Sequence, residues 1–369
     1  MKTLSRRSLL ALGATAPLAA RCSALQQDTF DRNAMLGAIA DNVLVPLAAE
    51  VDATQRALAT AATAFATEPT RETLAAGRAA WRSARVPLAR AQAFSAGPFE
   101  SLGLRSIIDW YPSSGAAIER LLAATTPISA TDLEIVGANQ RGMPAIEYLL
   151  FAADEAATLA ACTMGADAAR RRALVRSAAE LSSQRATQFS AAWSRATGDY
   201  AGELERAGRG SAAFATTRAA VDLLVNQLIN ALETALMRFS VPLGASSGGT
   251  PQPDRAESPF SDNSIADARA RLEGVDAVYL GRLGARSGIG LRDLVLARIS
   301  GFDPIVRARA DDAFAAIDRI PTTLRVAVVQ HAALVQAAAD AIREWRRAVQ
   351  TDISAALGVT VTFTDGDGD

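Results

Sequence analysis

Residues Ser211–Ser240 read SAAFATTRAAVDLLVNQLINALETALMRFS, and this stretch decides the class of fold. Its large apolar side chains recur at steps of three, four and seven residues, namely Phe214, Val221, Val225, Leu228, Leu232 and Phe239. Such steps place side chains on one face of an α-helix, where they can cover a hydrophobic core. The stretch therefore predicts a long amphipathic helix over 211–240.

The same periodicity recurs on both sides of this stretch. Leu44, Leu47, Val51, Leu58 and Phe65 predict a helix over 30–67. Proline should kink that helix at Pro46, because its ring and missing N–H disturb the preceding turn. The other helices that we expect cover 70–94 with a kink at Pro87, 116–123, 131–142, a helix from 143, 167–207, 263–283, 291–299, 304–318 and 322–357.

Composition agrees with an all-α fold. Half of the 369 residues are hydrophobic and only 5% are aromatic, which favours helices packed through small and aliphatic side chains. About ten helices exceed one four-helix bundle, so we predict two side-by-side helical bundles over 28–206 and 207–369. The segment 241–261, rich in Gly, Ser and Pro, is the predicted linker loop, and a short irregular tail ends the chain.

The scarce residue types narrow the function. The formal net charge of −1 provides no field that would attract nucleic acid, so no nucleic-acid partner is expected. The two cysteines are Cys22 and Cys162, and the single histidine is His331. No internal disulfide framework can form in the mature chain, and most zinc, haem and triad chemistry lacks its ligands. His331 falls on the apolar stripe of the helix over 322–357, where we expect it to be buried with one hydrogen-bond partner.

The N-terminus carries a targeting pattern. Residues 1–24 combine a basic start with a short apolar run, as in a signal peptide, and Ser5–Leu10 resembles a twin-arginine signal. We expect a periplasmic protein cleaved near Ala24. Lipid anchoring at Cys22 is less favoured because Arg21 precedes it. Peripheral membrane attachment stays open, and no later segment is predicted to span a bilayer.

The stretch Arg141–Phe151, RGMPAIEYLLF, holds the strongest candidate for a site. Glu147 lies near the start of a helix that opens at Gly142–Pro144, where it could contact a ligand or metal. An acidic residue there also simply complements the helix dipole. Three further candidates, Arg105, Asp109 and Tyr111, lie in a helix-poor stretch that could face Arg141 and Glu147, although salt bridges between the two loops are an equal alternative.

Several segments together resemble the imelysin-like family. These are Ala80–Arg82 through Gly97–Phe99, Asp109–Pro112, the stretch Arg141–Phe151, the mid-chain segment Phe239–Ser261, and the ending with Leu357–Gly358 and Phe363–Asp369. They occur along most of the mature chain. The resemblance implies a two-bundle helical fold in the periplasm or on the envelope surface. It also implies a link to iron acquisition, with iron-uptake components of the envelope as partners.

The chain departs from the family's Gly-x-His-x-x-Glu motif at one position. Gly142 and Glu147 match the outer positions, whereas Pro144 replaces the histidine. Proline offers no donor or lone pair to a metal, so a metal site carried over from the family is doubtful. If Glu147 does bind a metal, carboxylate and tyrosine oxygens suit iron or another divalent or trivalent cation.

Three functions remain open. The leading hypothesis is an envelope binding protein associated with iron uptake, with its ligand site near Gly142–Glu147. The second is a metallopeptidase, which family naming suggests and Pro144 disfavours, so whether the protein is an enzyme stays open. The third is a structural or interaction module that has lost its metal site. In the tail, Asp365, Asp367 and Asp369 have calcium-loop spacing, but a solvated acidic tail is the favoured interpretation.

Overall fold

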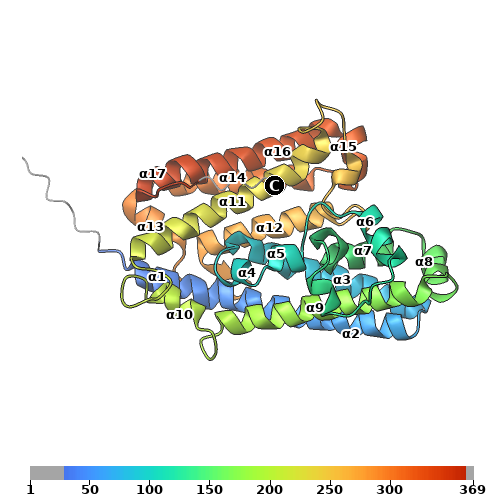
Figure 1. Ribbon diagram of the computed structural model, residues 1–369. Helices are drawn as coiled ribbons and strands as arrows, with labels where there is room; N and C mark the ends of the chain where they lie inside the picture. Colours follow the sequence, from blue (N-terminus) through green and yellow to red (C-terminus); the bar gives the residue numbers. More distant parts are fainter. Residues whose placement is uncertain (1–28, 363–369) are drawn as a thin grey trace, which may run out of the picture. The chain divides into compact units, whose positions relative to one another are not determined.

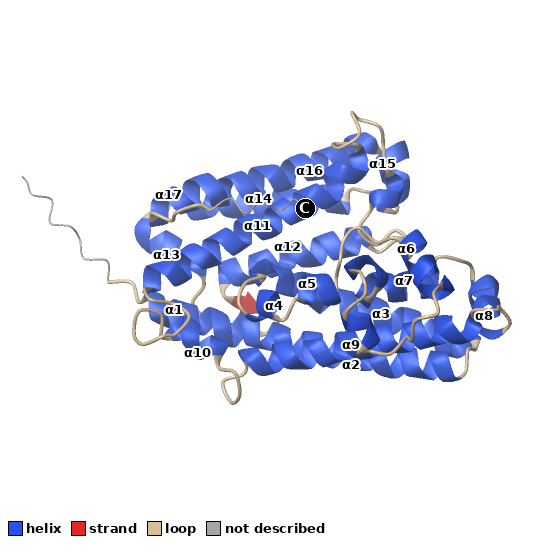
Figure 2. Ribbon diagram, viewed as in Figure 1, coloured by secondary structure: helices blue, strands red, loops and turns tan. Residues whose placement is uncertain are grey.

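Helices make up nearly all the regular structure of the computed structural model, which describes residues 29–362 (Figure 2). The predicted signal peptide over residues 1–24 and the three tail aspartates lie outside the described residues. From Asp31 onward the described chain forms one compact unit. The prediction of an all-α fold is therefore confirmed for this part of the chain, while the boundary at residue 207 stays a prediction.

The first long helix is continuous through Pro46. It consists of α1 (Arg32–Ile39), a π-turn (Ala40–Leu44) and α2 (Val45–Thr67). The wider π-turn lies directly before the proline, where it relieves the clash of the ring with the preceding turn. The whole helix has the length and apolar composition of a membrane-crossing helix, but 56% of its most apolar window is buried by other parts of the protein. A helix in the core of a protein has the same length and apolar composition.

The first set of packed helices surrounds α2. The helix α2 lies against α3 (Arg71–Ala91) and α9 (Ala168–Trp193), and α7 (Gly142–Phe151) packs on α3 and α9 (Figure 1). The predicted apolar face of α2 is buried in this packing. Between α7 and α9 the chain forms α8 (Glu155–Thr163).

The second set of packed helices surrounds α11 (Thr217–Leu243). It contains α12 (Ser264–Leu280), α14 (Phe302–Asp318) and α16 (Ala332–Arg347), with α11 against α12 and α16, and α14 against α16 (Figure 1). The apolar stripe that predicts α11 is buried along its whole length. The helix α12 also packs on α3, so it joins the second set of helices to the first.

Shorter elements connect these helices. They are α4 (Pro98–Ser101), α5 (Leu104–Ile107), α6 (Gly115–Ala123), α10 (Tyr200–Glu205), α13 (Leu291–Arg298), α15 (Leu324–Gln330), a π-turn (Ala348–Ile353) and α17 (Ser354–Leu357). Two-residue strands, β1 (Arg282–Leu283) and β2 (Arg286–Ser287), form an antiparallel hairpin in which Arg282 pairs with Ser287.

Two predicted helices differ in the structure. The segment 131–142 contains only the 3₁₀ turns Asp132–Glu134 and Ala138–Gln140 before α7 begins at Gly142. Leu133 is buried but Ile135 is 90% exposed, so the segment has no continuous apolar helix face to bury. The helix expected over 167–207 ends at Trp193. A tight turn follows, in which any side chain at Gly198 would meet the backbone of Ala192.

The helix expected over 322–357 is broken at His331. This residue separates α15 from α16 with non-helical backbone angles (φ −133°, ψ 35°), and it is only half-buried. The prediction of a buried histidine is therefore wrong, because the break turns His331 away from the stripe that Val335 and Ile342 continue.

The mid-chain loop begins later than predicted. Pro242 still belongs to the last turn of α11, and the helix ends at Gly244, whose φ of +107° favours glycine. We call residues 244–263 the mid-chain loop; they contain one 3₁₀ turn, Pro253–Arg255. Near the C-terminus, residues 359–362 form neither helix nor strand, as expected for the irregular tail. They are held by Asn226, which bonds Thr360 O and Thr362 N, each at 2.9 Å.

Candidate functional site

Glu147 is buried at the contact between α7 and the mid-chain loop. Its side chain is 1% exposed, and its Oε1 accepts hydrogen bonds from three donors of the loop. These donors are Phe260 N at 3.0 Å, Ser261 N at 2.8 Å and Ser261 Oγ at 2.7 Å. The carboxyl group thus fixes the end of the loop onto α7.

The ionisation of Glu147 is finely balanced. Burial raises its pKa to about 7, because the apolar surroundings disfavour the charged form. The hydrogen bonds from Ser261 and the positive charge of Arg85 act in the opposite direction but only in part offset the burial. At neutral pH the carboxyl group therefore exists in both protonation states.

The start of α7 requires the glycine of the motif. Gly142 has a φ of +69°, and a side chain there would approach Ile108 O within 2.4 Å. This close approach lets Met143 N donate to Ile108 O at 2.7 Å. Trp81 Nε1 of α3 donates to Met143 O at 3.0 Å. Pro144 fits the first turn, where a missing N–H costs no helical hydrogen bond.

Arg141 holds the segment before α7 in place and does not contact Glu147. Its guanidinium donates to three backbone carbonyls: Nε to Ser106 O at 3.0 Å, and Nη1 to Leu133 O at 2.8 Å and Glu134 O at 2.5 Å. These bonds tie the segment before α7 to α5. Arg141 is thus positioned as a structural residue, and its bonds account for its burial.

Beside Glu147 lies a buried group of charges that we call the arginine cluster, composed of Arg85, Arg238 and Arg271 with Asp109, Glu257 and Asp267. Arg85, on α3, contacts all three carboxylates: Asp109, Glu257 at 3.3 Å and Asp267 at 3.1 Å. The side chains of Arg85 and Asp267 are almost fully buried. Ser258 and Asn263 complete the hydrogen bonds of Asp267.

Glu257, from the mid-chain loop, meets all three arginines of the cluster. Arg271 binds it with two hydrogen bonds, Nη2 to Oε1 at 2.6 Å and Nη1 to Oε2 at 3.0 Å. Arg238 Nε lies 3.5 Å from the same Oε1. Burial alone would raise the pKa of Glu257, but the charges of Arg271, Arg238 and Arg85 hold it well below its ordinary value. Glu257 is therefore ionised at neutral pH.

One of the predicted site residues, Asp109, belongs to this cluster, and a second, Tyr111, packs against it. Asp109 bonds Arg85 and Gln92, and the ring of Tyr111 stacks under Arg238, with 3.6 Å from the guanidinium carbon to the ring centroid. The hydroxyl of Tyr111 donates to Arg255 O at 2.7 Å, and burial raises its pKa. Arg105, by contrast, is exposed on α5 and contacts no member of the cluster within the described part of the chain.

The other residues of the cluster were not predicted from the sequence. Arg85 could have been predicted, because it lies on the apolar face of α3, four residues after Trp81 and three before Leu88. An arginine on such a face needs a buried carboxylate partner. The partners of Arg85 lie 24, 172 and 182 residues away in the sequence. They could therefore be identified only once the fold was known.

The residues around Glu147 do not fit a metal ion. Within residues 29–362, no group of three or more His, Cys, Asp or Glu side chains is placed to hold one. Glu147 Oε1 already accepts three hydrogen bonds, and the neighbouring carboxylates are paired with arginines. A metal ion would have to displace several buried hydrogen bonds and ion pairs.

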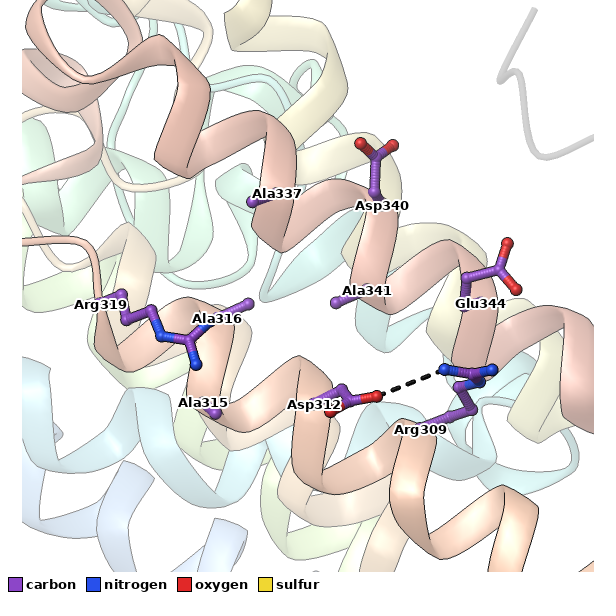
Figure 3. Close-up of a pocket in the computed structure, with 9 residues that line it drawn as sticks. All are labelled: Arg309, Asp312, Ala315, Ala316, Arg319, Ala337, Asp340, Ala341 and Glu344. Carbon is purple, nitrogen blue, oxygen red and sulfur yellow. Dashed lines mark hydrogen bonds and ion pairs between the residues drawn. The ribbon is translucent and has the colours of Figure 1, made fainter.

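A separate groove of about 300 Å³ lies on the surface between α14 and α16 (Figure 3). Its floor is formed by alanines and its rim by charged side chains, including the pair Arg309–Asp312 at 3.4 Å. The lining residues are Arg309, Asp312, Ala315, Ala316, Arg319, Ala337, Asp340, Ala341 and Glu344. None of the residues that the sequence predicts for the site lies there.

The fold and the match to a family of known proteins define the class of protein. The family model described as Imelysin matches residues 45–349, which include α2, α7 and α16. The chain belongs to the imelysin family. It is 30% identical over 315 residues to Iron-regulated protein A of Synechococcus elongatus, a match that covers 84% of this chain and 81% of the relative.

Solved structures show the same fold. A putative iron-regulated protein A precursor from Parabacteroides distasonis matches with a TM-score of 0.75 and 18% identity, covering 89% of this chain and 95% of that protein. An imelysin-like protein from Psychrobacter arcticum matches with a TM-score of 0.70 and 18% identity, covering 90% and 97%. The arrangement of helices is therefore that of the imelysin-like fold.

Proposed function

We propose that this protein is an exported envelope protein that supports iron uptake by binding or interaction, and that it is not a peptidase. The observation that carries the proposal is the environment of Glu147, whose Oε1 is occupied by Phe260 and Ser261 of the mid-chain loop. A carboxyl group used in this way fixes a loop. Glu147 Oε1 is fully engaged by the loop, which leaves one oxygen, Oε2, for any other partner.

The link to iron and to the envelope rests on the relatives and on the N-terminal sequence. Two relatives carry the words iron-regulated protein A in their names, and one of them is called a precursor. A precursor is the form that carries a segment later removed, and residues 1–24 of this chain have the pattern of such a segment. We therefore propose a periplasmic location and envelope iron-uptake components as partners.

The metallopeptidase alternative is disfavoured by the chemistry of the site. A catalytic zinc needs about three protein ligands and one open position. Pro144 stands where the family resemblance places a histidine, and proline cannot ligate. The described residues supply no replacement set of ligands. We propose that this chain has kept the motif's Gly142 and Glu147 for structure.

The proposal includes a two-bundle organisation with the ligand site beside the Gly142–Glu147 motif. Helices before residue 207 pack mainly around α2, and those after it around α11. The contact of α3 with α12 joins the two sets, and the arginine cluster lies at that contact. Its buried charges are the feature nearest the motif that could recognise a polar ligand.

A complementation experiment tests this function. A strain that lacks the gene should grow poorly when iron is chelated, and the wild-type chain should restore growth. Glu147→Gln should restore growth equally, because the amide keeps the shape and the acceptor oxygen that the loop needs. Failure of Glu147→Gln, with the protein present at the normal level, would indicate metal or acid–base chemistry at Glu147. Normal growth of the strain without the gene would favour a module with no role in iron uptake.

A further inference from the structure

The arginine cluster contains more positive groups than Asp109 and Asp267 can neutralise. Arg85, Arg238 and Arg271 come from α3, α11 and α12, respectively, whereas Asp109 and Asp267 both contact Arg85. The third carboxylate, Glu257, comes from the mid-chain loop. Without Glu257 the cluster would hold three positive and two negative charges in a buried space, which strongly favours an added anion.

Glu257 also has the geometry of a bound ligand. Its two oxygens face Arg271 in a bidentate arrangement, which is how guanidinium groups recognise planar carboxylates. Arg85 and Arg238 approach the same Oε1 from two other helices. For Arg238 and Arg271, Glu257 is the one carboxylate in contact within the described chain.

One hydrogen-bond donor of the arginine cluster has no acceptor among the described residues. Arg238 Nε is buried and has no hydrogen-bond partner within residues 29–362, although it lies 3.5 Å from Glu257 Oε1. Buried donors of charged groups are normally satisfied. A ligand with more acceptor oxygens than one glutamate side chain could bond this donor, while Tyr111 supports the guanidinium from its other face.

The mid-chain loop is exposed and held differently before Glu257 and after it. After Glu257, the loop is fixed at Phe260 and Ser261 by Glu147. Before it, residues 245–255 are mostly exposed and include Gly248 and Gly249 at positive φ. To leave the cluster, Glu257 has to break the bond of Tyr111 with Arg255 O and that of Ser258 with Asp267, whereas the anchor at Glu147 can stay in place.

We propose that Arg85, Arg238 and Arg271 form a binding site for a small organic carboxylate, and that Glu257 occupies this site when the mid-chain loop is closed. A ligand binds by replacing the carboxylate of Glu257 as the loop lifts. This site does not depend on the link to iron. It can therefore be tested independently of the function proposed above.

Calorimetric titration with succinate tests the proposal, with succinamide as the uncharged probe of the same shape. In Glu257→Gln the competing charge is gone, so succinate should bind about tenfold tighter or more than to the wild type. Succinamide should bind neither protein. Adding Arg238→Gln to the first change should weaken succinate binding by about tenfold. The matched control is Glu273→Gln, which removes a half-exposed glutamate paired with Arg90 and should bind succinate as the wild type does.

The proposal is overturned if folded Glu257→Gln binds no succinate, or binds it no more tightly than the wild type. Limited digestion with trypsin decides the matter if that variant does not fold. In the wild type, succinate but not succinamide should speed cleavage after Arg255, which is exposed two residues before Glu257. A cleavage rate that succinate leaves unchanged at every concentration would contradict the proposal.

Discussion

At the scale of single residues, Glu147 links the charge state of a buried carboxyl group to the stability of the protein. Its pKa is raised in the folded state from 4.5 to about 7, so the folded protein binds the proton more tightly than the unfolded chain does. The stabilisation is complete below the unfolded value and is lost as the pH rises through 7.

We predict a difference in pH dependence between the wild type and Glu147→Gln. Between about pH 5 and pH 8, the free energy of unfolding of the wild type should fall by about 2 to 3 kcal/mol relative to the variant. Glutamine does not titrate and still presents an acceptor oxygen to Ser261. Urea unfolding at several pH values measures both curves, and parallel curves would show that Glu147 does not titrate in this range.

Glu147→Ala should be much more harmful than Glu147→Gln. It leaves the N–H groups of Phe260 and Ser261 and the hydroxyl of Ser261 without their acceptor in a buried place. We expect a loss of about 3 kcal/mol in the free energy of unfolding at neutral pH. Denaturant unfolding checks this value, and equal stabilities of the two variants would contradict the anchoring role.

The sequence could predict some of these residues but not their partners. Asp109 and Tyr111 were found because a helix-poor stretch beside a motif is a good place for function. Arg105 lies in the same stretch but points to solvent, and Arg141 uses its donors on backbone carbonyls. The direction of a loop side chain depends on contacts between distant segments, which one sequence does not reveal.

At the scale of elements, the entry into α7 depends on the backbone of Gly142. An alanine there would have a strained φ and would bring its Cβ within 2.5 Å of the carbonyl oxygens of Ile107 and Ile108. We expect Gly142→Ala to lower the free energy of unfolding by about 3 kcal/mol or more. Thermal unfolding monitored by circular dichroism measures the change.

Gly77→Ala provides the matched control for Gly142→Ala. Gly77 lies inside α3 with ordinary helical geometry, and its new Cβ would touch Leu150 at a normal 3.5 Å. Alanine favours helix more than glycine does, so this variant should be stabilised by about 0.5 to 1 kcal/mol. If both variants lost equal stability, the positive φ of Gly142 would not explain its presence.

Periodicity predicted the long helices because they bury a regular stripe. The stripes of α2 and α11 were read correctly, as was the location of α14. The breaks were harder to predict, because the break at His331 and the turn after Trp193 interrupt sequences that still have helical composition. Tertiary contacts decide such breaks, so local propensity could not place them.

At the scale of the whole molecule, the contact between α3 and α12 joins the two sets of helices. The backbones touch at Gly274, where a Cβ would lie 2.2 Å from Arg90 O. Gly274→Ala should push the helices apart and strain the bonds of Arg85 with Asp267, lowering the free energy of unfolding by about 3 kcal/mol. Gly301→Ala is the control, since a Cβ there would meet open space.

Glu147 anchors the mid-chain loop, and we propose that it does not ligate a metal. The most direct test is the metal content of the protein purified from the periplasm, measured by mass spectrometry for the wild type and for Glu147→Gln. We predict that neither protein contains a metal in stoichiometric amount that depends on Glu147. One equivalent of iron or zinc in the wild type that is lost in Glu147→Gln would contradict the account.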